Sequence, residues 1–182
     1  MGFTFTQLDI PDVILVRSDS FPDKRGFFSE VYRQDIFQAH GIGPFVQENY
    51  SQSIKNVVRG MHYQTNPQQV GKLVSCPHGT IFDVVVDIRH TSRTFGKWTG
   101  VVLEDGNGML WVPPGFAHGF CVLSGTANVL YRQTQYYSRE HDRGIRWNDP
   151  NVGIVWPVSD PIISDKDACA PLLEDVDDDS LL

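Results

Sequence analysis

The segment TIFDVVVDI, residues 80–88, indicates the kind of fold that this chain adopts. It is short and rich in β-branched and aromatic residues, a composition typical of strands. Alternate side chains of a strand point to opposite faces, so Asp83, Val85 and Asp87 share one face, and we expect this acidic face to look inward. Similar runs separated by Gly, Pro, Asn and Asp recur from end to end, while helix-length periodic stretches are almost absent. The sequence therefore predicts an all-β sandwich or barrel.

Ten segments have the composition expected of strands, and one short helix interrupts them. The helix is expected over 34–41, ended by Gly41, and residues 164–171 have room for one helical turn. Residues 149–161 are expected to form a loop. The strands are expected over residues 13–17, 27–33, 45–53, 57–64, 72–76, 80–88, 98–104, 110–113, 118–124 and 127–137.

Length and charge indicate one domain followed by a short acidic tail. With 182 residues, 41% of them hydrophobic, the chain can bury one substantial core, and we assign residues 1–173 to a single domain. The formal net charge is -7, but five of the acids fall in EDVDDD at 174–179, so the rest of the chain is close to neutral. Residues 174–182 are expected to be poorly ordered. Because the basic residues form no dense run with interleaved aromatics, nucleic-acid binding is not expected.

The cysteines, the N-terminus and the histidines bear on compartment and cofactors. The three cysteines are an odd number without CxxC spacing, which favours a reducing cytoplasm over a disulfide framework. The N-terminus has no basic leader followed by an apolar core, and no apolar run approaches the ~20 residues that span a bilayer. The six histidines show neither H-x-H nor H-x-x-x-H spacing, so no bound metal is expected. No motif indicates a nicotinamide, a flavin or a P-loop.

The expected strand VVRGMHYQ, residues 57–64, carries polar residues where a strand usually carries packing. By strict alternation, Gly60 and His62 share one face and Arg59 points away from them. A β-bulge at the glycine would slip the alternation by one residue. We therefore predict an irregularity near Gly60 if Arg59 and His62 serve one pocket.

A pocket lined by His62, Lys72, His118 and Tyr131 is geometrically plausible, because each residue lies in or beside an expected strand. Each also has an ordinary structural interpretation. A strand histidine is often only a hydrogen-bonding residue, a tyrosine is a common core-edge residue, and a lysine at a strand start is usually solvated. Ser164 and Asp167 match a capping box, so Asp167 could simply begin a helical turn, and Arg25 could be only a turn residue.

Eight blocks in order along the chain resemble one family, that of dTDP-4-dehydrorhamnose 3,5-epimerase. The resemblance covers roughly residues 3 to 173 and implies a cofactor-free sugar-nucleotide enzyme with a cupin-like, double-stranded β-helix (jelly-roll) barrel. The blocks are DKRGFFSE (23–30), QENYSQS (47–53), VVRGMHYQ (57–64), GKLVSC (71–76), FDVVVDIR (82–89), WVPPGFAHGF (111–120), LYRQTQYY (130–137) and SDKDACAP (164–171).

The resemblance implies a role for each matching position. His62 stands where the family has its base, Asp167 where it has the carboxylate paired with that base, and Tyr131 where it has the proton donor. Lys72 stands where the family has the group near the C4 oxygen of the sugar, and Tyr137 where the family stacks a residue on thymine. The other positions that match nucleotide- or sugar-binding residues are Arg25, Glu30, Gln47, Asn49, Arg59, His118 and Lys166.

The implied reaction converts dTDP-4-dehydro-6-deoxy-D-glucose to dTDP-4-dehydro-L-rhamnose without a cofactor. The implied assembly is a homodimer with exchanged N-terminal strands, in which Arg25 and Glu30 complete the neighbour's site. Three alternatives stay open: an epimerase acting at only C3 or only C5 of a related sugar nucleotide, a sugar-nucleotide 3,4-ketoisomerase, and a non-catalytic sugar-nucleotide binding module.

Overall fold

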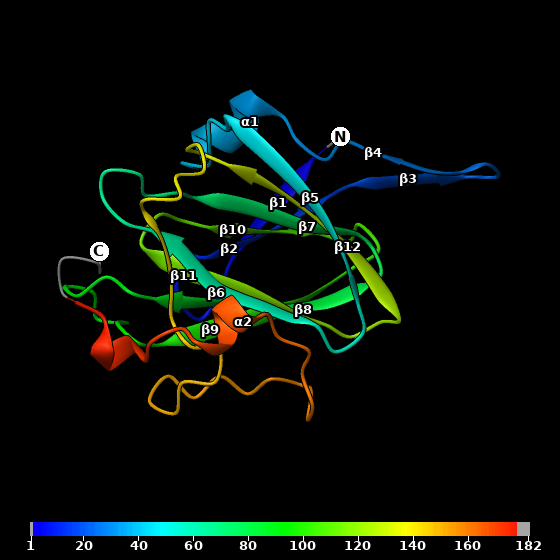
Figure 1. Ribbon diagram of the computed structural model, residues 1–182. Helices are drawn as coiled ribbons and strands as arrows, with labels where there is room; N and C mark the ends of the chain where they lie inside the picture. The colour runs from blue at the N-terminus through cyan, green and yellow to red at the C-terminus, as the bar shows by residue number, and fades with distance from the viewer. Residues whose placement is uncertain (1, 178–182) are drawn as a thin grey trace.

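Two antiparallel sheets lie face to face in the computed structural model, which describes residues 2–177 (Figure 1). This double-sheet arrangement confirms the predicted all-β jelly roll. The six-stranded sheet contains, in spatial order, β1 (Phe3–Gln7), β2 (Ile14–Ser18), β10 (Met109–Val112), β7 (Lys72–His78), β12 (Thr126–Gln133) and β5 (Gln47–Ile54). The five-stranded sheet contains β13 (Asp142–Gly144), β6 (Val58–Gln64), β11 (Phe116–Val122), β8 (Thr80–Asp87) and β9 (Trp98–Glu104).

The remaining elements are short. A hairpin of β3 (Ser20–Asp23) and β4 (Gly26–Ser29) projects away from the body of the molecule (Figure 1). The helical segments are α1 (Gln34–Ala39), α2 (Asp165–Ala168) and the single 3₁₀ turn η1 (Leu173–Asp175). No helix within residues 2–177 is long and apolar enough to cross a membrane.

Strand β8 shows how the alternation of side chains builds the core. Ile81 and Val85 point between the two sheets, while Val84 and Val86 belong to a second apolar cluster on the outer face of the five-stranded sheet. The acidic face looks inward as expected, because Asp83 and Asp87 have no exposed surface. The outer cluster is completed by residues of the 145–176 segment, which covers that face.

A strand is present in each of the ten segments where one was expected, and a helix in the segment where it was expected. Some of the predicted bounds were wrong, and three strands were missed. The strand predicted over 27–33 ends at Ser29, and the one predicted over 127–137 ends at Gln133. Gln133 pairs with Gln47 and Lys72, the first residues of both neighbouring strands, and beyond it, among the described residues, a single backbone bond of 3.0 Å runs from the Thr134 N–H to the Gly71 carbonyl. The missed strands are β1, β3 and β13.

Residues 178–182 of the predicted acidic tail lie outside the described residues. Leu173 is buried in the outer apolar cluster, and Val176 packs against the same cluster. Glu174 accepts a hydrogen bond of 2.9 Å from Asn151 Nδ2. The division of the chain after residue 173 stays a prediction.

Candidate active site

The predicted irregularity near Gly60 is confirmed by the pairing of β6 with β11. His62 pairs with His118, but Arg59 pairs with Phe120, so β6 advances three residues while β11 advances two. This is a β-bulge with one extra residue on β6. Gly60 has φ +123°, and a Cβ there would lie 2.5 Å from the Cα of Gly119, so only glycine fits.

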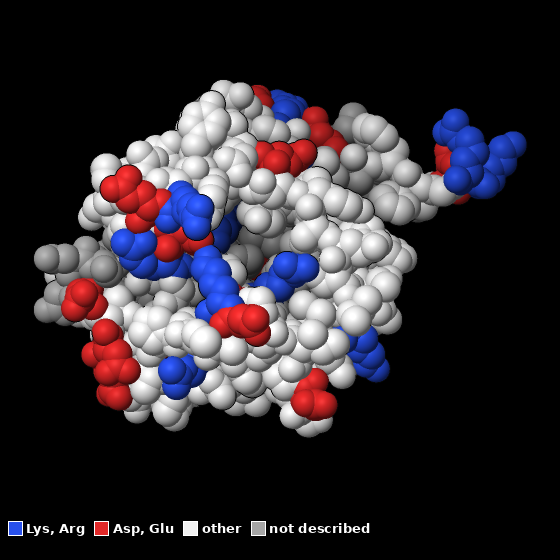
Figure 2. All heavy atoms as spheres, viewed as in Figure 1, with Lys and Arg blue, Asp and Glu red and all other residues white. Residues whose placement is uncertain are grey.

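Because of the bulge, Arg59 and His62 line the same cavity, which has a volume of about 480 Å³. The cavity lies between the two sheets, since β6 and β11 supply one wall and β12 supplies the other. Figure 2 shows a hollow on this face of the molecule with Lys and Arg side chains gathered around it. The lining residues include the predicted Arg59, His62, Lys72, His118, Tyr131, Lys166 and Asp167.

His62 is paired with the buried carboxylate of Asp167, with 2.7 Å between Nε2 and Oδ1. Asp167 is 4% exposed, and its other oxygen accepts a bond from the N–H of Gly60. Burial by itself raises the pKa of Asp167, but the bonds from His62, Gly60 and Ser164 together hold the pKa below its usual value. An ionised Asp167 accepts the proton of His62 Nε2, which leaves the lone pair of the neutral ring on Nδ1.

Asp167 makes the contacts that both interpretations require. The hydroxyl of Ser164 caps helix α2 by accepting a 3.2 Å hydrogen bond from the Asp167 N–H. The Asp167 side chain is directed to His62. The cap therefore fixes the backbone from which the carboxylate reaches the histidine.

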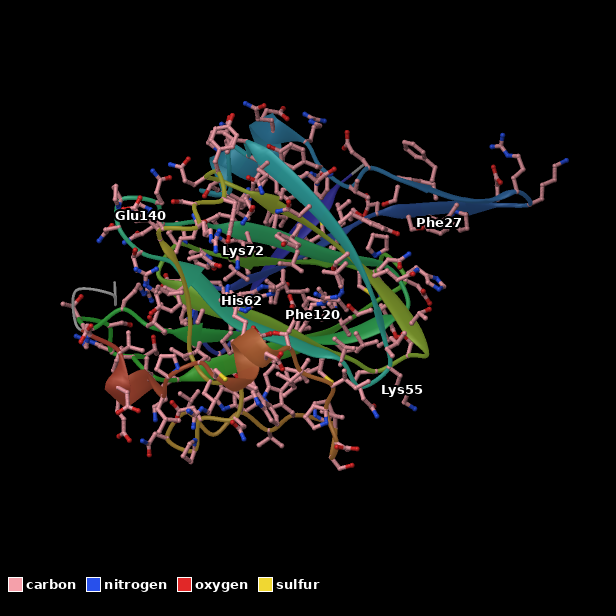
Figure 3. All side chains as sticks on the ribbon, in the orientation of Figure 1. Phe27, Lys55, His62, Lys72, Phe120 and Glu140 are labelled. Atoms are coloured by element: carbon pink, nitrogen blue, oxygen red, sulfur yellow. The ribbon has the colours of Figure 1, made fainter. Side chains whose placement is uncertain are left out.

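Lys72 is buried, which excludes a solvated role at the start of β7. It is 9% exposed, and its Nζ donates a 3.2 Å hydrogen bond to the backbone carbonyl of His62 (Figure 3). Burial lowers the pKa of Lys72 to about 8, while the carboxylates of Asp142 and Asp83 oppose this effect. A pKa of about 8 keeps the group mainly protonated at pH 7, so the cavity contains a buried cation.

Tyr131 faces the cavity from β12, in the sheet opposite His62. Burial raises the pKa of Tyr131 above its ordinary value of 10.0. The phenol is therefore protonated at neutral pH and can donate a proton. Figure 3 places His62, Lys72 and Phe120 close together near the centre of the molecule, and all three line this cavity.

Arg59 lines the cavity and bonds to a residue of β5, whereas Gln47 and Asn49 line neither this cavity nor an adjacent one and are linked to the adjacent cavity through Gln133. Arg59 Nε donates to Ser53 Oγ at 2.9 Å. Gln47 Nε2 donates to Asn49 Oδ1 at 3.1 Å, and Asn49 Nδ2 donates to Gln133 Oε1 at 2.8 Å. Gln133 lines an adjacent cavity of about 280 Å³ that shares four lining residues with the first: His62, Lys72, Tyr131 and Lys166.

Tyr137 also lines the adjacent cavity, beside a residue that the sequence did not reveal. The Tyr137 hydroxyl donates to Asp142 Oδ2 at 3.2 Å, and Lys166 Nζ donates to the same oxygen at 2.5 Å. Asp142 reaches this position because β13 pairs with β6, where Asp142 lies opposite Gln64. No pattern in the sequence around residue 142 indicated this pairing.

Within residues 2–177, Arg25 and Glu30 line neither cavity and have no hydrogen-bonded link to one, unlike Gln47 and Asn49. Arg25 is near the tip of the projecting hairpin, where its side chain is 83% exposed and paired with Asp23. Glu30 directly follows the hairpin, and its Oε2 is buried without a hydrogen-bond partner among the described residues. Within one chain the structure does not bring them to the site.

The fold and the cavity define a jelly-roll protein whose interior is equipped for acid–base chemistry. A histidine with a carboxylate partner, a protonated tyrosine and a buried ammonium face one space. Within residues 2–177 no group of three or more His, Cys, Asp or Glu is placed to hold a metal ion.

Comparisons with known proteins agree with this class. The family model for dTDP-4-dehydrorhamnose 3,5-epimerase matches residues 7–175, so the chain belongs to that family, a family of isomerases. An enzyme of this name from Salmonella typhimurium is 51% identical over 170 residues, covering 91% of this chain and 92% of the relative.

Solved structures give the same result for the fold, which confirms the cupin-like jelly roll. A dTDP-6-deoxy-D-glucose-3,5-epimerase from Legionella pneumophila, in complex with dTDP-4-keto-L-rhamnose, has a TM-score of 0.95 at 41% identity and covers 99% of this chain and 97% of its own. A 3'-monoepimerase from Streptomyces bikiniensis, in complex with dTDP-quinovose, has a TM-score of 0.87 at 31% identity. The match covers 92% of this chain and 87% of the monoepimerase chain.

Proposed function

We propose that this protein epimerises dTDP-4-dehydro-6-deoxy-D-glucose at C3 and C5 to give dTDP-4-dehydro-L-rhamnose. The observation that carries the proposal is the placement of His62 and Tyr131 on facing sheets of one cavity, with Lys72 buried in the same space. A substrate lying between them meets a base on one face and an acid on the other. This arrangement allows a proton to leave one face of a carbon and another to arrive on the opposite face, which inverts the carbon.

The C3 and C5 hydrogens of the sugar are acidic because each lies next to the C4 ketone. His62 Nδ1 takes such a proton, and the electrons of the C–H bond move onto the C4 oxygen to form an enolate. Asp167 stabilises the imidazolium that results. A positioned base of this kind contributes about 10²–10⁴-fold to the rate.

Tyr131 returns a proton to the opposite face of the same carbon, while the enolate electrons reform the C4 ketone. After one inversion His62 holds one more proton and Tyr131 one fewer. The two groups return to their first states through solvent before the second carbon reacts. Hydrogen from water therefore enters the product at each inverted carbon.

Lys72 stabilises the enolate by placing its ammonium beside the developing negative charge. Such preorganised charge in a water-poor site is often the largest single contribution to catalysis. The hydrogen bond from Lys72 Nζ to the His62 carbonyl ties the cation to the strand that carries the base.

The nucleotide part of the substrate binds through groups around the two cavities. Arg59 and Lys166 supply positive charge for the diphosphate, and the exposed ring of Tyr137 offers a face for thymine. Gln47 and Asn49 orient the wall beside Tyr137, since Gln47 Oε1 accepts a 2.9 Å bond from the Tyr137 N–H. This remote binding positions the sugar for proton transfer.

We further propose that the protein is a homodimer in which each β3–β4 hairpin completes the neighbour's site. The hairpin carries three exposed phenylalanines, Phe21, Phe27 and Phe28, on a projection that extends from the body of its own chain (Figure 3). Strand β5 ends its sheet with an open edge and exposes Tyr50 and Ile54. Exposed apolar edges of this kind are typical of interfaces.

The dimer proposal is tested by mixing two inactive variants, Arg25→Ala and His62→Ala. If Arg25 serves the neighbouring site, a mixed dimer contains one site with both residues intact. After subunit exchange the mixture should regain about a quarter of wild-type turnover, because half of the dimers are mixed and half of their sites are intact. No recovery in a mixture that exchanges subunits contradicts a role in the neighbour's site.

A C3-only epimerase is the second candidate, because a structural relative of this chain is a 3'-monoepimerase. Incubation of the wild type with dTDP-4-dehydro-6-deoxyglucose in D₂O separates the two functions. Two deuteriums in the sugar, with inverted configuration at C3 and C5 by NMR, support the main proposal. One deuterium at C3 supports the second candidate, and none contradicts both.

We propose the cytoplasm as the compartment. All three cysteines, Cys76, Cys121 and Cys169, are free thiols. Free thiols suit a reducing environment.

A further inference from the structure

A second histidine–aspartate pair lies beside the first, deeper in the cavity wall. His118 pairs with His62 across the β6–β11 ladder, and its Nε2 lies 2.7 Å from Oδ1 of Asp83. The geometry matches that of His62 and Asp167, which are joined through the same atoms at the same distance. The two pairs differ in burial, since the side chain of His62 is 32% exposed and that of His118 only 7%.

Asp83 is an unusual residue for the interior of a barrel. It has no exposed surface, His118 is its hydrogen-bond partner, and its second oxygen has no partner among the described residues. A buried carboxylate satisfied on one oxygen costs stability, and an apolar residue of similar size would remove that cost. Its neighbours on the inward face of β8, Ile81 and Val85, are apolar core residues.

The proton position on His118 follows from this pairing. An ionised carboxylate only accepts hydrogen bonds, so Asp83 holds the His118 proton on Nε2 and leaves a lone pair on Nδ1 of the neutral ring. The His118 ring lines the cavity that contains His62, Lys72 and Tyr131. The structure shows no hydrogen-bond partner for His118 Nδ1 in the described part of the chain.

We infer that Asp83 is a positioning residue that fixes His118 as a hydrogen-bond acceptor for one ring hydroxyl of the sugar. This inference rests on the proposed function, because it assumes a 4-keto sugar in the cavity. The ring hydroxyls of such a sugar are those on C2, next to a reacting carbon, and on C3, itself a reacting carbon. A fixed acceptor at the cavity wall holds the ring so that the C–H bond to be broken faces His62.

The Asp83→Asn variant tests the inference because it keeps the size of the side chain and reverses its hydrogen bond. The amide of the introduced asparagine donates to His118 Nε2, so the proton moves to Nδ1, which then donates instead of accepting. Nitrogen-15 NMR of the histidine rings reports this change directly. We expect Nε2–H in the wild type and Nδ1–H in the variant; Nδ1–H in the wild type overturns the inference even if the variant fails to fold.

The kinetic test compares three substrates by deuterium exchange at C5: the 4-keto-6-deoxy sugar nucleotide and its 2-deoxy and 3-deoxy analogues. Asp83→Asn should lower kcat/KM about 10- to 100-fold on the parent, but about threefold or less on the analogue that lacks the hydroxyl bound by His118. Asp83 also supports the charge on Lys72, an effect common to all three substrates. The readout is therefore the difference between substrates.

Asp87→Asn is the matched control, because Asp87 is equally buried on the same face of β8 but bonds to Arg89, Ser92 and Thr94. It should change stability without changing the His118 tautomer or the substrate preference. If Asp83→Asn lowers kcat/KM equally on all three substrates while the wild type exchanges normally, the inference about Asp83 is overturned and the proposed function is not. A wild type that exchanges no deuterium contradicts the proposed function instead.

Discussion

Replacing Lys72 by methionine should make the protein more stable and much less active. The buried ammonium opposes folding, because burial lowers its pKa from 10.5 to about 8. One pKa unit corresponds to about 1.4 kcal/mol. Keeping this group charged in the folded state therefore costs about 3 kcal/mol at pH 7, and methionine, with a similar shape, removes that cost.

The effect of Lys72 on stability depends on pH. The unfolded chain binds the Lys72 proton more tightly than the folded protein does, so wild-type stability rises with pH between about 8 and 10.5. Methionine has no proton to lose. The stability gained by Lys72→Met should be full below pH 8 and should fade across this range.

Activity should change in the opposite direction. Loss of one preorganised donor to a developing oxyanion typically costs ~2.7–4 kcal/mol of barrier, or about 10²–10³-fold in kcat. KM should change little, because Lys72 is directed to the reacting oxygen and not to the nucleotide. In the wild type, kcat should fall as pH rises above about 8, since the ammonium loses its proton.

The assay combines urea unfolding at pH 7 and pH 10 with steady-state turnover. The control is Lys55→Met, which replaces an exposed lysine in the turn between β5 and β6, away from the cavity (Figure 3). Lys55→Met should alter stability by less than about 0.5 kcal/mol and leave turnover unchanged. A Lys72→Met variant with wild-type kcat, or with lower stability at pH 7, refutes the reasoning.

Three further changes test other parts of the site. Asp167→Asn should move the His62 proton to Nδ1 and lower kcat about 10²–10⁴-fold with little change in dTDP affinity by calorimetry, whereas an unchanged kcat contradicts the pairing. Gly60→Ala should destabilise the protein by about 1–3 kcal/mol in urea unfolding, because its Cβ would lie 2.5 Å from Gly119 Cα, and a neutral effect contradicts the bulge. Asp142→Ala should release Lys166 and Tyr137 and weaken dTDP binding about tenfold with a smaller change in kcat, whereas unchanged affinity contradicts a role for Asp142 in holding these two side chains at the nucleotide site.

The strands and the bulge could be predicted because both depend on local sequence. Short β-branched runs between turn residues identified every long strand, and the alternation in VVRGMHYQ required a slip at Gly60 for Arg59 and His62 to meet. Two of the three missed strands are short or irregular. β13 has three residues, and β3 contains Pro22, which lowers the strand signal.

Residues brought to the site by tertiary pairing could not be predicted from pattern alone. Asp142 joins the site because β13 pairs with β6, and no local signal carries that information. The inward face of Asp83 was expected, but its bond to His118 depends on the pairing of β8 with β11. The projection of Arg25 away from the cavity follows from the hairpin, whose second strand was expected to run to residue 33.

The central claim is that His62 removes the proton and Tyr131 returns it from the other face. Deuterium exchange by Tyr131→Phe in D₂O tests it most directly. The account predicts exchange at C3 and C5 within about tenfold of the wild-type rate, with no epimerised product, since the base is intact and the acid is missing. Loss of exchange in folded Tyr131→Phe, or formation of the inverted sugar at the wild-type rate, would contradict it.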